Sequence, residues 1–199
     1  MRSGLAPMWF WHQEKPEWIA ERRVSPAGPP TGIALDERDA CRSIEKRKIV
    51  KMKVAWIGKT KEPAIQALTD EYLKRISRFA EIAGIALKDE AAILSLARGE
   101  RAQNPHKERH KLVLLDSRGK QLSSEELAAF LEREQVNAIP LLFAIGGSDG
   151  FSEEARAHAG FTLSLGKMTL PHELARVVLV EQLYRAFTIL KNHPYHLGH

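Results

Sequence analysis

Two glycine-containing segments hold residues of the types that build ligand-binding loops in this 199-residue sequence. Residues 145–151 read Ile-Gly-Gly-Ser-Asp-Gly-Phe, and residues 165–172 read Leu-Gly-Lys-Met-Thr-Leu-Pro-His. Glycines directly after a strand let the backbone approach a ligand closely and present its N–H groups. The first segment lacks the G-x-G-x-x-G pattern, and no Gly-Lys-Ser/Thr follows it, so a dinucleotide or nucleoside triphosphate site is poorly supported. A bare glycine turn into a helix is the alternative interpretation.

The second segment offers both apolar surface and a titratable side chain. Leu165, Met168 and Leu170 could cover the faces of an adenine while backbone groups contact its edge. His172 falls at the start of a predicted helix, where a neutral imidazole is favoured over the cation. We therefore predict a capping or packing role for His172 rather than a role as a base.

Histidines and a tyrosine gather around a proline at the end of the sequence, where residues 192–199 read Asn-His-Pro-Tyr-His-Leu-Gly-His. Imidazole and phenol groups can stack on a nucleic-acid base or carry a proton. The alternative is an ordinary polar chain end, because termini are commonly frayed and polar.

Strands and helices alternate along residues 52–199. Apolar runs predict strands at residues 53–58, 85–87, 111–116, 140–146 and 161–165. Helical spacing of apolar residues predicts helices at residues 63–80, 91–101, 123–135 and 171–192. Continuous apolar strands between helices are typical of a parallel sheet with helices on both faces, so the predicted class is α/β. Both glycine-containing loops then follow neighbouring strands at their carboxyl ends, where open sheets of this class bind ligands.

The predicted helix at residues 171–192 is apolar around nearly its whole circumference. Glu181, Arg185 and Thr188 form a narrow polar stripe, and Arg176 lies roughly opposite. A helix of this kind must be buried almost all round. Because a terminal helix on its own sheet exposes one side, we predict a two-fold homodimer that covers it. A core helix in a larger monomer is the alternative.

Residues 1–51 differ in composition from residues 52–199. They include the run Ser-Pro-Ala-Gly-Pro-Pro-Thr-Gly, which cannot continue a helix or a central strand. They carry ten Lys or Arg and seven Asp or Glu, whereas residues 52–199 carry twenty and eighteen. The net charge of residues 52–199 is therefore only +2 of the total of +5, so that part of the chain has no general excess of basic residues. We predict an N-terminal extension that is disordered or lies upstream of a true start at Met52. A targeting or RNA-binding arm is the alternative.

The cysteine count and the apolar runs exclude several classes of protein. Cys41 is the only cysteine, so no disulfide can form within a monomer, and no Cys/His cluster has zinc-ligand spacing. No apolar run reaches the roughly 18 residues that a membrane span needs. We expect a cytoplasmic protein with no metal and no membrane partner.

Taken together, the motifs resemble those of the RlmH family, the ribosomal RNA large subunit methyltransferase H proteins of the SPOUT class. The resemblance rests on four segments: Phe-Ala-Ile-Gly-Gly-Ser-Asp-Gly-Phe at 143–151, Leu-Ser-Leu-Gly-Lys-Met-Thr-Leu-Pro-His at 163–172, Arg-Val-Val-Leu-Val-Glu-Gln-Leu-Tyr-Arg-Ala-Phe at 176–187 and His-Pro-Tyr-His at 193–196. Residues 53–58, 72–75 and 115–120 look like the opening strand, the first helix and the middle loop of the family. The resemblance covers nearly all of residues 52–199, whereas residues 1–51 have no counterpart in it.

The resemblance implies a parallel sheet whose C-terminal part forms a trefoil knot, with knot loops that bind S-adenosylmethionine. By position it implicates these residues in cofactor binding: Leu115, Gly146, Gly147, Leu165, Gly166, Lys167, Met168, Thr169 and Leu170. It also implies a homodimer that acts on a pseudouridine of 23S ribosomal RNA in the assembled ribosome and forms N3-methylpseudouridine. One subunit's tail would complete the other subunit's site.

The chemistry that the resemblance implies needs groups that handle a proton and a developing charge. Methyl transfer from a sulfonium is an in-line displacement and requires no metal, but the N3–H of pseudouridine must lose its proton. His196 and Tyr195 are the candidates for handling that proton, and Arg185 could hold a phosphate or the developing charge. Another SPOUT activity, on a ribose 2′-oxygen or on transfer RNA, is the nearest alternative, and a ribosome-binding factor without catalysis is a further one.

Overall fold

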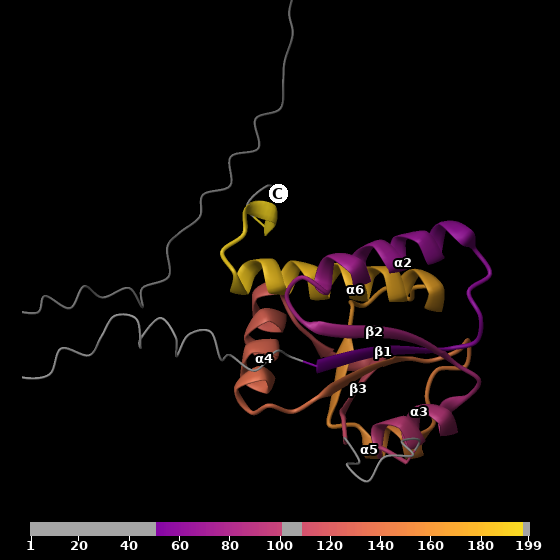
Figure 1. Ribbon diagram of the computed structural model, residues 1–199. Helices are drawn as coiled ribbons and strands as arrows, with labels where there is room; N and C mark the ends of the chain where they lie inside the picture. The colour runs from indigo at the N-terminus through magenta and orange to yellow at the C-terminus, as the bar shows by residue number, and fades with distance from the viewer. Residues whose placement is uncertain (1–50, 101–108, 197–199) are drawn as a thin grey trace, which may run out of the picture. The chain divides into compact units, whose positions relative to one another are not determined.

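The computed structural model describes residues 51–100 and 109–196 (Figure 1). All of them belong to residues 44–199, the second of two units into which the chain divides. The predicted extension at residues 1–51 lies outside the described residues except for Lys51, and its boundary stays a prediction. In the described part of the chain, no helix is long and apolar enough to cross a membrane.

A five-stranded sheet with every neighbouring pair parallel forms the centre of the domain. Its strands, in chain order, are β1 (Lys51–Ile57), β2 (Glu81–Leu87), β3 (Lys111–Gln121), β4 (Leu141–Ile145) and β5 (Phe161–Ser164). They lie in the order β2-β1-β4-β3-β5. The predicted α/β class and the predicted parallel sheet are therefore confirmed, while the trefoil knot stays a prediction.

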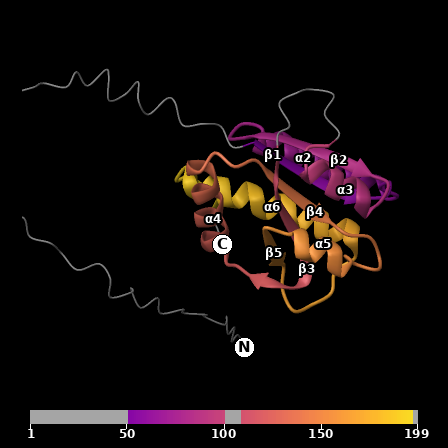
Figure 2. The ribbon, with the colours of Figure 1, turned by 90° about the horizontal axis from the view of Figure 1, so that it is seen from below.

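Helices cover both faces of this sheet, as Figures 1 and 2 show. They are α2 (Pro63–Ile76), α3 (Glu90–Ala97), α4 (Ser124–Val136), α5 (Glu153–His158) and α6 (His172–Leu190), followed by a 3-10 turn, η1 (Pro194–His196). Side chains of β4 alternate between the two faces because successive residues of a strand point to opposite sides. Phe143 packs in one core with α2, α4 and α6, and Leu142 packs in the other with α3 and α5.

Five elements differ clearly from prediction, and two of them, α2 and α3, each end four residues before the predicted limits at residues 80 and 101. The six-residue α5 was missed because it buries only Ala155 and so shows no apolar periodicity. The strand β3 runs five residues beyond the predicted 111–116. Its second half is polar and largely exposed, so no apolar run predicted it. The strand β2 begins at Glu81 and not at the predicted residue 85. The prediction began too late because this edge strand is half exposed and lacks a continuous apolar run.

The packing of α6 corrects one argument for a homodimer. This helix lies between α2 and α4 above the sheet, and ten of its nineteen residues are buried within the chain (Figure 1). Its apolar circumference is therefore largely covered by its own chain and does not by itself require a second subunit. Leu174 remains 42% exposed and Val178 half-buried, which leaves a narrow apolar stripe on the open side.

A buried arginine ties the start of α6 to the loop after β1. Arg176 is 1% exposed, and its guanidinium lies 4.3 Å from the centre of the Trp56 ring. It donates hydrogen bonds to the hydroxyls of Thr69 (3.2 Å) and Thr60 (2.9 Å). Burial lowers the pKa of this guanidinium, and the charge of Glu173 opposes the shift. Such contacts compensate for the cost of removing a charge from water, so they hold the first turn of α6 in place.

We expect Leu183→Ala in α6 to lower the free energy of unfolding by about 2–5 kcal/mol, because truncating a core leucine leaves a cavity. Leu183 is 0% exposed, whereas Val136 at the end of α4 is 80% exposed. The control Val136→Ala should change the free energy by less than about 0.5 kcal/mol. Urea unfolding at one fixed protein concentration measures both, and equal effects would contradict the assignment of α6 to the core.

Candidate ligand-binding site

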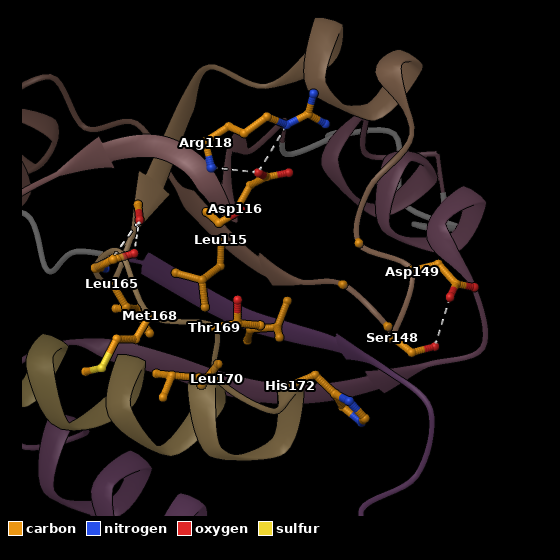
Figure 3. A pocket seen from close by; sticks show the side chains of 18 of the residues that line it. Leu115, Asp116, Arg118, Ser148, Asp149, Leu165, Met168, Thr169, Leu170 and His172 are labelled. Carbon is orange, nitrogen blue, oxygen red and sulfur yellow. Dashed lines mark hydrogen bonds and ion pairs between the residues drawn. The ribbon is translucent and has the colours of Figure 1, made fainter.

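A pocket of about 410 Å³ opens beside the carboxyl ends of β4 and β5 and the middle of β3, after the part of β3 that pairs with β4 (Figure 3). Its walls come from the middle of β3, the glycine loop after β4, Arg156 of α5, the loop after β5 and the first turn of α6. This is where the parallel sheet was predicted to place a ligand.

The pocket brings together eight of the nine residues that the sequence predicted for cofactor binding. They are Leu115, Gly146, Gly147, Leu165, Gly166, Met168, Thr169 and Leu170. The ninth, Lys167, lies exposed in the same loop but is not one of the lining residues. The predicted set is thus one cluster in space, although its three segments are far apart in the sequence.

The glycine loop is shaped by close backbone packing at Gly146. A Cβ atom at this position would lie 3.1 Å from the backbone carbon and oxygen of Gly150. The turn itself is closed by a hydrogen bond of 3.2 Å from the N–H of Gly150 to the carbonyl of Gly147. Because backbone atoms can retreat only if the loop moves, a side chain at Gly146 would displace this wall of the pocket.

A break in the pairing of β3 with β5 supplies the polar wall. Leu163 of β5 pairs first with Leu115 and then with Lys120, so the four residues between them leave the regular ladder. A Cβ atom at Gly119 would lie 2.7 Å from the backbone of Leu163, which explains the glycine at this position. The excursion places Asp116 and Arg118 on the pocket wall (Figure 3).

The residues of this polar wall are not among those predicted from the sequence. The Asp116 side chain is 7% exposed and accepts hydrogen bonds from the backbone N–H of Arg118 and from Nε of Arg156, both at 2.9 Å. Burial alone would raise the pKa of Asp116, but these two hydrogen bonds outweigh it and hold the pKa below its usual value. Arg156 went unnoticed because it belongs to the short helix α5, and Asp116 because an acid after a strand has no distinctive pattern.

His172 lies on the rim of the pocket, as Figure 3 shows. The N-cap of α6 is Pro171, which makes no side-chain cap hydrogen bond, and the His172 side chain is exposed. The predicted capping or packing role is therefore not supported by its surroundings.

Two of the predicted catalytic residues, Arg185 and Tyr195, lie at the end of α6 that is far from the pocket. Together with Glu181 they form the tail cluster. The Tyr195 hydroxyl donates to Oε1 of Glu181 (3.2 Å), and Nε and a terminal nitrogen of Arg185 donate to the same oxygen (3.1 and 2.8 Å). The Arg185 guanidinium also lies 5.1 Å from the centre of the Tyr195 ring. The side chain of His196 lies outside the described residues.

The length of α6 keeps this tail cluster apart from the pocket in one chain. Arg185 lies thirteen positions after His172 within α6. At a rise of 1.5 Å per residue this corresponds to roughly 20 Å along the helix axis. Arg185 and Tyr195 therefore do not line the pocket of their own chain.

The environment of Tyr195 favours its protonated form. Burial raises the pKa of the phenol, and hydrogen bonds with Tyr72 and the charge of Glu181 raise it further. The ring packs edge-on against Tyr184 with centroids 4.8 Å apart. A phenol that holds its proton can donate a hydrogen bond but is a poor base at neutral pH.

An open parallel α/β sheet with a ligand-sized pocket at the carboxyl ends of its strands defines the class of this protein. The family model described as "Predicted SPOUT methyltransferase" matches residues 50–196. Given this match and the relatives described next, the chain belongs to the SPOUT methyltransferases, in the family of ribosomal RNA large subunit methyltransferase H.

Two of the relatives that carry that family name illustrate the similarity. The protein of Koribacter versatilis is 54% identical over 151 residues, which cover 75% of this chain and 100% of the relative. The protein of Geobacter sulfurreducens is 42% identical over 152 residues, which cover 74% of this chain and 99% of the relative. Among solved structures, the SpoU methyltransferase AviRb from Streptomyces viridochromogenes in complex with AdoMet has 14% identity and a TM-score of 0.43, over 69% of this chain and 58% of that one.

We expect Asp116 to make the stability of the domain depend on pH in the acid range. Because the pKa of folded Asp116 lies below its usual 3.8, its ionised form stabilises the fold above that pH. This stabilisation is lost as the pH falls through the lower folded pKa. Wild-type protein should therefore be more stable than Asp116→Asn at neutral pH, and the difference should shrink below pH 3.8.

Urea unfolding of both proteins from about pH 6 down to about pH 2.5 measures this difference. A difference that stays constant across the series would contradict the ionic role of Asp116.

Proposed function

We propose that this protein transfers a methyl group from S-adenosylmethionine to N3 of a pseudouridine in 23S ribosomal RNA, acting on the assembled ribosome. The observation that carries the proposal is that the three segments resembling the family's cofactor loops line one and the same pocket. Family membership supports it, since relatives named as large subunit ribosomal RNA methyltransferases align over almost their whole length.

The lining of the pocket fits S-adenosylmethionine. Its volume of about 410 Å³ falls within the range of small-molecule sites. Leu115, Leu165 and Leu170 offer apolar surface for the adenine, and the glycine loop brings backbone groups close to the ligand. When bound, S-adenosylmethionine supplies a methyl group on a positively charged sulfur. The walls then serve to orient the ligand and to exclude water from it.

A second copy of the chain provides the tail that the pocket lacks. The tail cluster and the pocket lie at opposite ends of α6, so neither can complete the other within one chain. In an antiparallel homodimer, the open stripe at Leu174 and Val178 would face its counterpart and bring each tail to the partner's pocket. The separation of the pocket from the tail cluster thus supports a homodimer together with the open stripe on α6.

The tail residues have distinct roles in this scheme. Arg185 stabilises the negative charge that develops when N3 loses its proton, and Tyr195, whose one hydroxyl proton is donated to Glu181, keeps its ring against the Arg185 guanidinium and so positions it. His196 accepts that proton, since an imidazole titrates near neutral pH. Glu181 holds Arg185 and Tyr195 in one geometry through its Oε1.

Labelled S-adenosylmethionine, purified ribosomes that lack the modification and the full-length chain test the activity directly. We expect label on N3 of one pseudouridine of the large subunit RNA, identified by nucleoside analysis. Label on a ribose or on transfer RNA would instead establish another activity of the same class. Cofactor and ribosome binding without any label would establish a non-catalytic binding factor.

Mixing two inactive variants tests whether the tail acts on the partner's pocket. Gly146→Ala should displace the pocket wall, and Arg185→Gln should remove the charge of the tail. After subunit exchange, half of the dimers are mixed and each has one intact combination of pocket and tail, so we expect about a quarter of the wild-type rate. A mixture no more active than its components would show that each site is built from one chain.

A further inference from the structure

The pocket has an apolar end and a polar end, which is the pattern expected for a ligand with two unlike halves. Leu165, Met168 and Leu170 lie on one side of the cavity in Figure 3, and Asp116 and Arg118 lie across it. The proposed function assigns the apolar end to the adenine. The polar end is then left for the other half of the ligand.

The charges at the polar end balance one another. Two arginines, Arg118 and Arg156, and two acids, Asp116 and Asp149, line the cavity. A site for a polyphosphate would carry an excess of positive charge, because each phosphate brings negative charge that must be compensated. Balanced charges of both signs suit a zwitterion, such as the α-amino acid group of a nucleoside derivative.

The two arginines differ in how firmly they are held. Arg156 is 21% exposed and has short contacts to Asp116 (2.9 Å) and Glu153 (2.8 Å). Arg118 is 61% exposed, and its guanidinium lies 3.7 Å from Asp116 and 3.3 Å from Glu153. Because Glu153 is 81% exposed, its pair with Arg118 is screened by water and contributes little. Arg118 is therefore free to turn toward a ligand, whereas Arg156 holds Asp116 in place.

We propose that Arg118 binds the carboxylate of the amino acid half of the cofactor and so fixes the direction in which the cofactor lies in the pocket. The inference rests on the proposed function, because it takes S-adenosylmethionine as the ligand. A guanidinium suits a carboxylate because its paired N–H groups match the two oxygens. The buried carboxylate of Asp116 beside it suits the adjacent ammonium group.

Two ligands that differ in the amino acid half test the assignment by calorimetry. S-adenosylhomocysteine retains that half, and 5′-methylthioadenosine lacks it. We expect Arg118→Gln to weaken the binding of S-adenosylhomocysteine roughly ten- to a hundredfold, the effect of one charged hydrogen-bonded pair, and to leave 5′-methylthioadenosine within about twofold. Retained binding of 5′-methylthioadenosine also shows that the variant folds and keeps its adenine site.

Lys120→Gln is the matched control, because it removes one positive charge from the same strand, as Arg118→Gln does. Lys120 is exposed and does not line the pocket. This variant should bind both ligands as the wild type does. Equal weakening of both ligands by Arg118→Gln, or weakening of S-adenosylhomocysteine by Lys120→Gln to the same extent, would overturn the assignment of the carboxylate to Arg118. Failure of the wild-type protein to bind either ligand would instead overturn the proposed function.

Discussion

Parallel pairing of β3 with both β4 and β5 is the constraint on which the site depends. Leu115 of β3 lies opposite Ile145 of β4 and Leu163 of β5, so three chain segments reach the same edge of the sheet together. Because parallel strands run in the same direction, the loops that follow them leave the sheet at the same edge. Together these loops enclose the pocket. The break after Leu115 adds the polar wall to that space. The pocket is therefore a product of strand direction as much as of side-chain chemistry.

The helix α6 imposes the opposite constraint, because it holds the pocket and the Arg185–Tyr195 pair apart. Its first turn borders the pocket and is anchored by the buried Arg176, while its last turns carry Arg185 beneath Tyr195. A continuous helix with a covered circumference cannot fold back on itself. The pocket and the Arg185–Tyr195 pair can meet only if they come from different chains, so the proposed homodimer would make the chemistry depend on assembly.

Much of this arrangement could be predicted from the sequence, and the failures have physical causes. The apolar runs of β3 and β4 predicted the parallel sheet. The glycines after β4 and β5 predicted the loops at its edge. The polar wall escaped notice because Asp116 and Arg156 come together only through the break in β3 and the short helix α5, neither of which leaves a periodic signal. The near-complete apolar surface of α6 was recognised, but its cover came from α2 and α4, which no pattern in α6 could reveal.

Every residue that lines the pocket falls between positions 115 and 175, so β1, β2, α2 and α3 contribute none of its walls. The first half of the domain supports the sheet, and the second half forms the pocket. Substitutions in the two halves consequently reach the pocket by different routes. Those in residues 51–100 act on it only through the packing of the domain, as Thr60 and Thr69 do through Arg176, whereas those in residues 115–118, 145–150 and 164–170 change its lining directly. The lining can therefore be varied at positions that leave the core contributed by residues 51–100 unchanged.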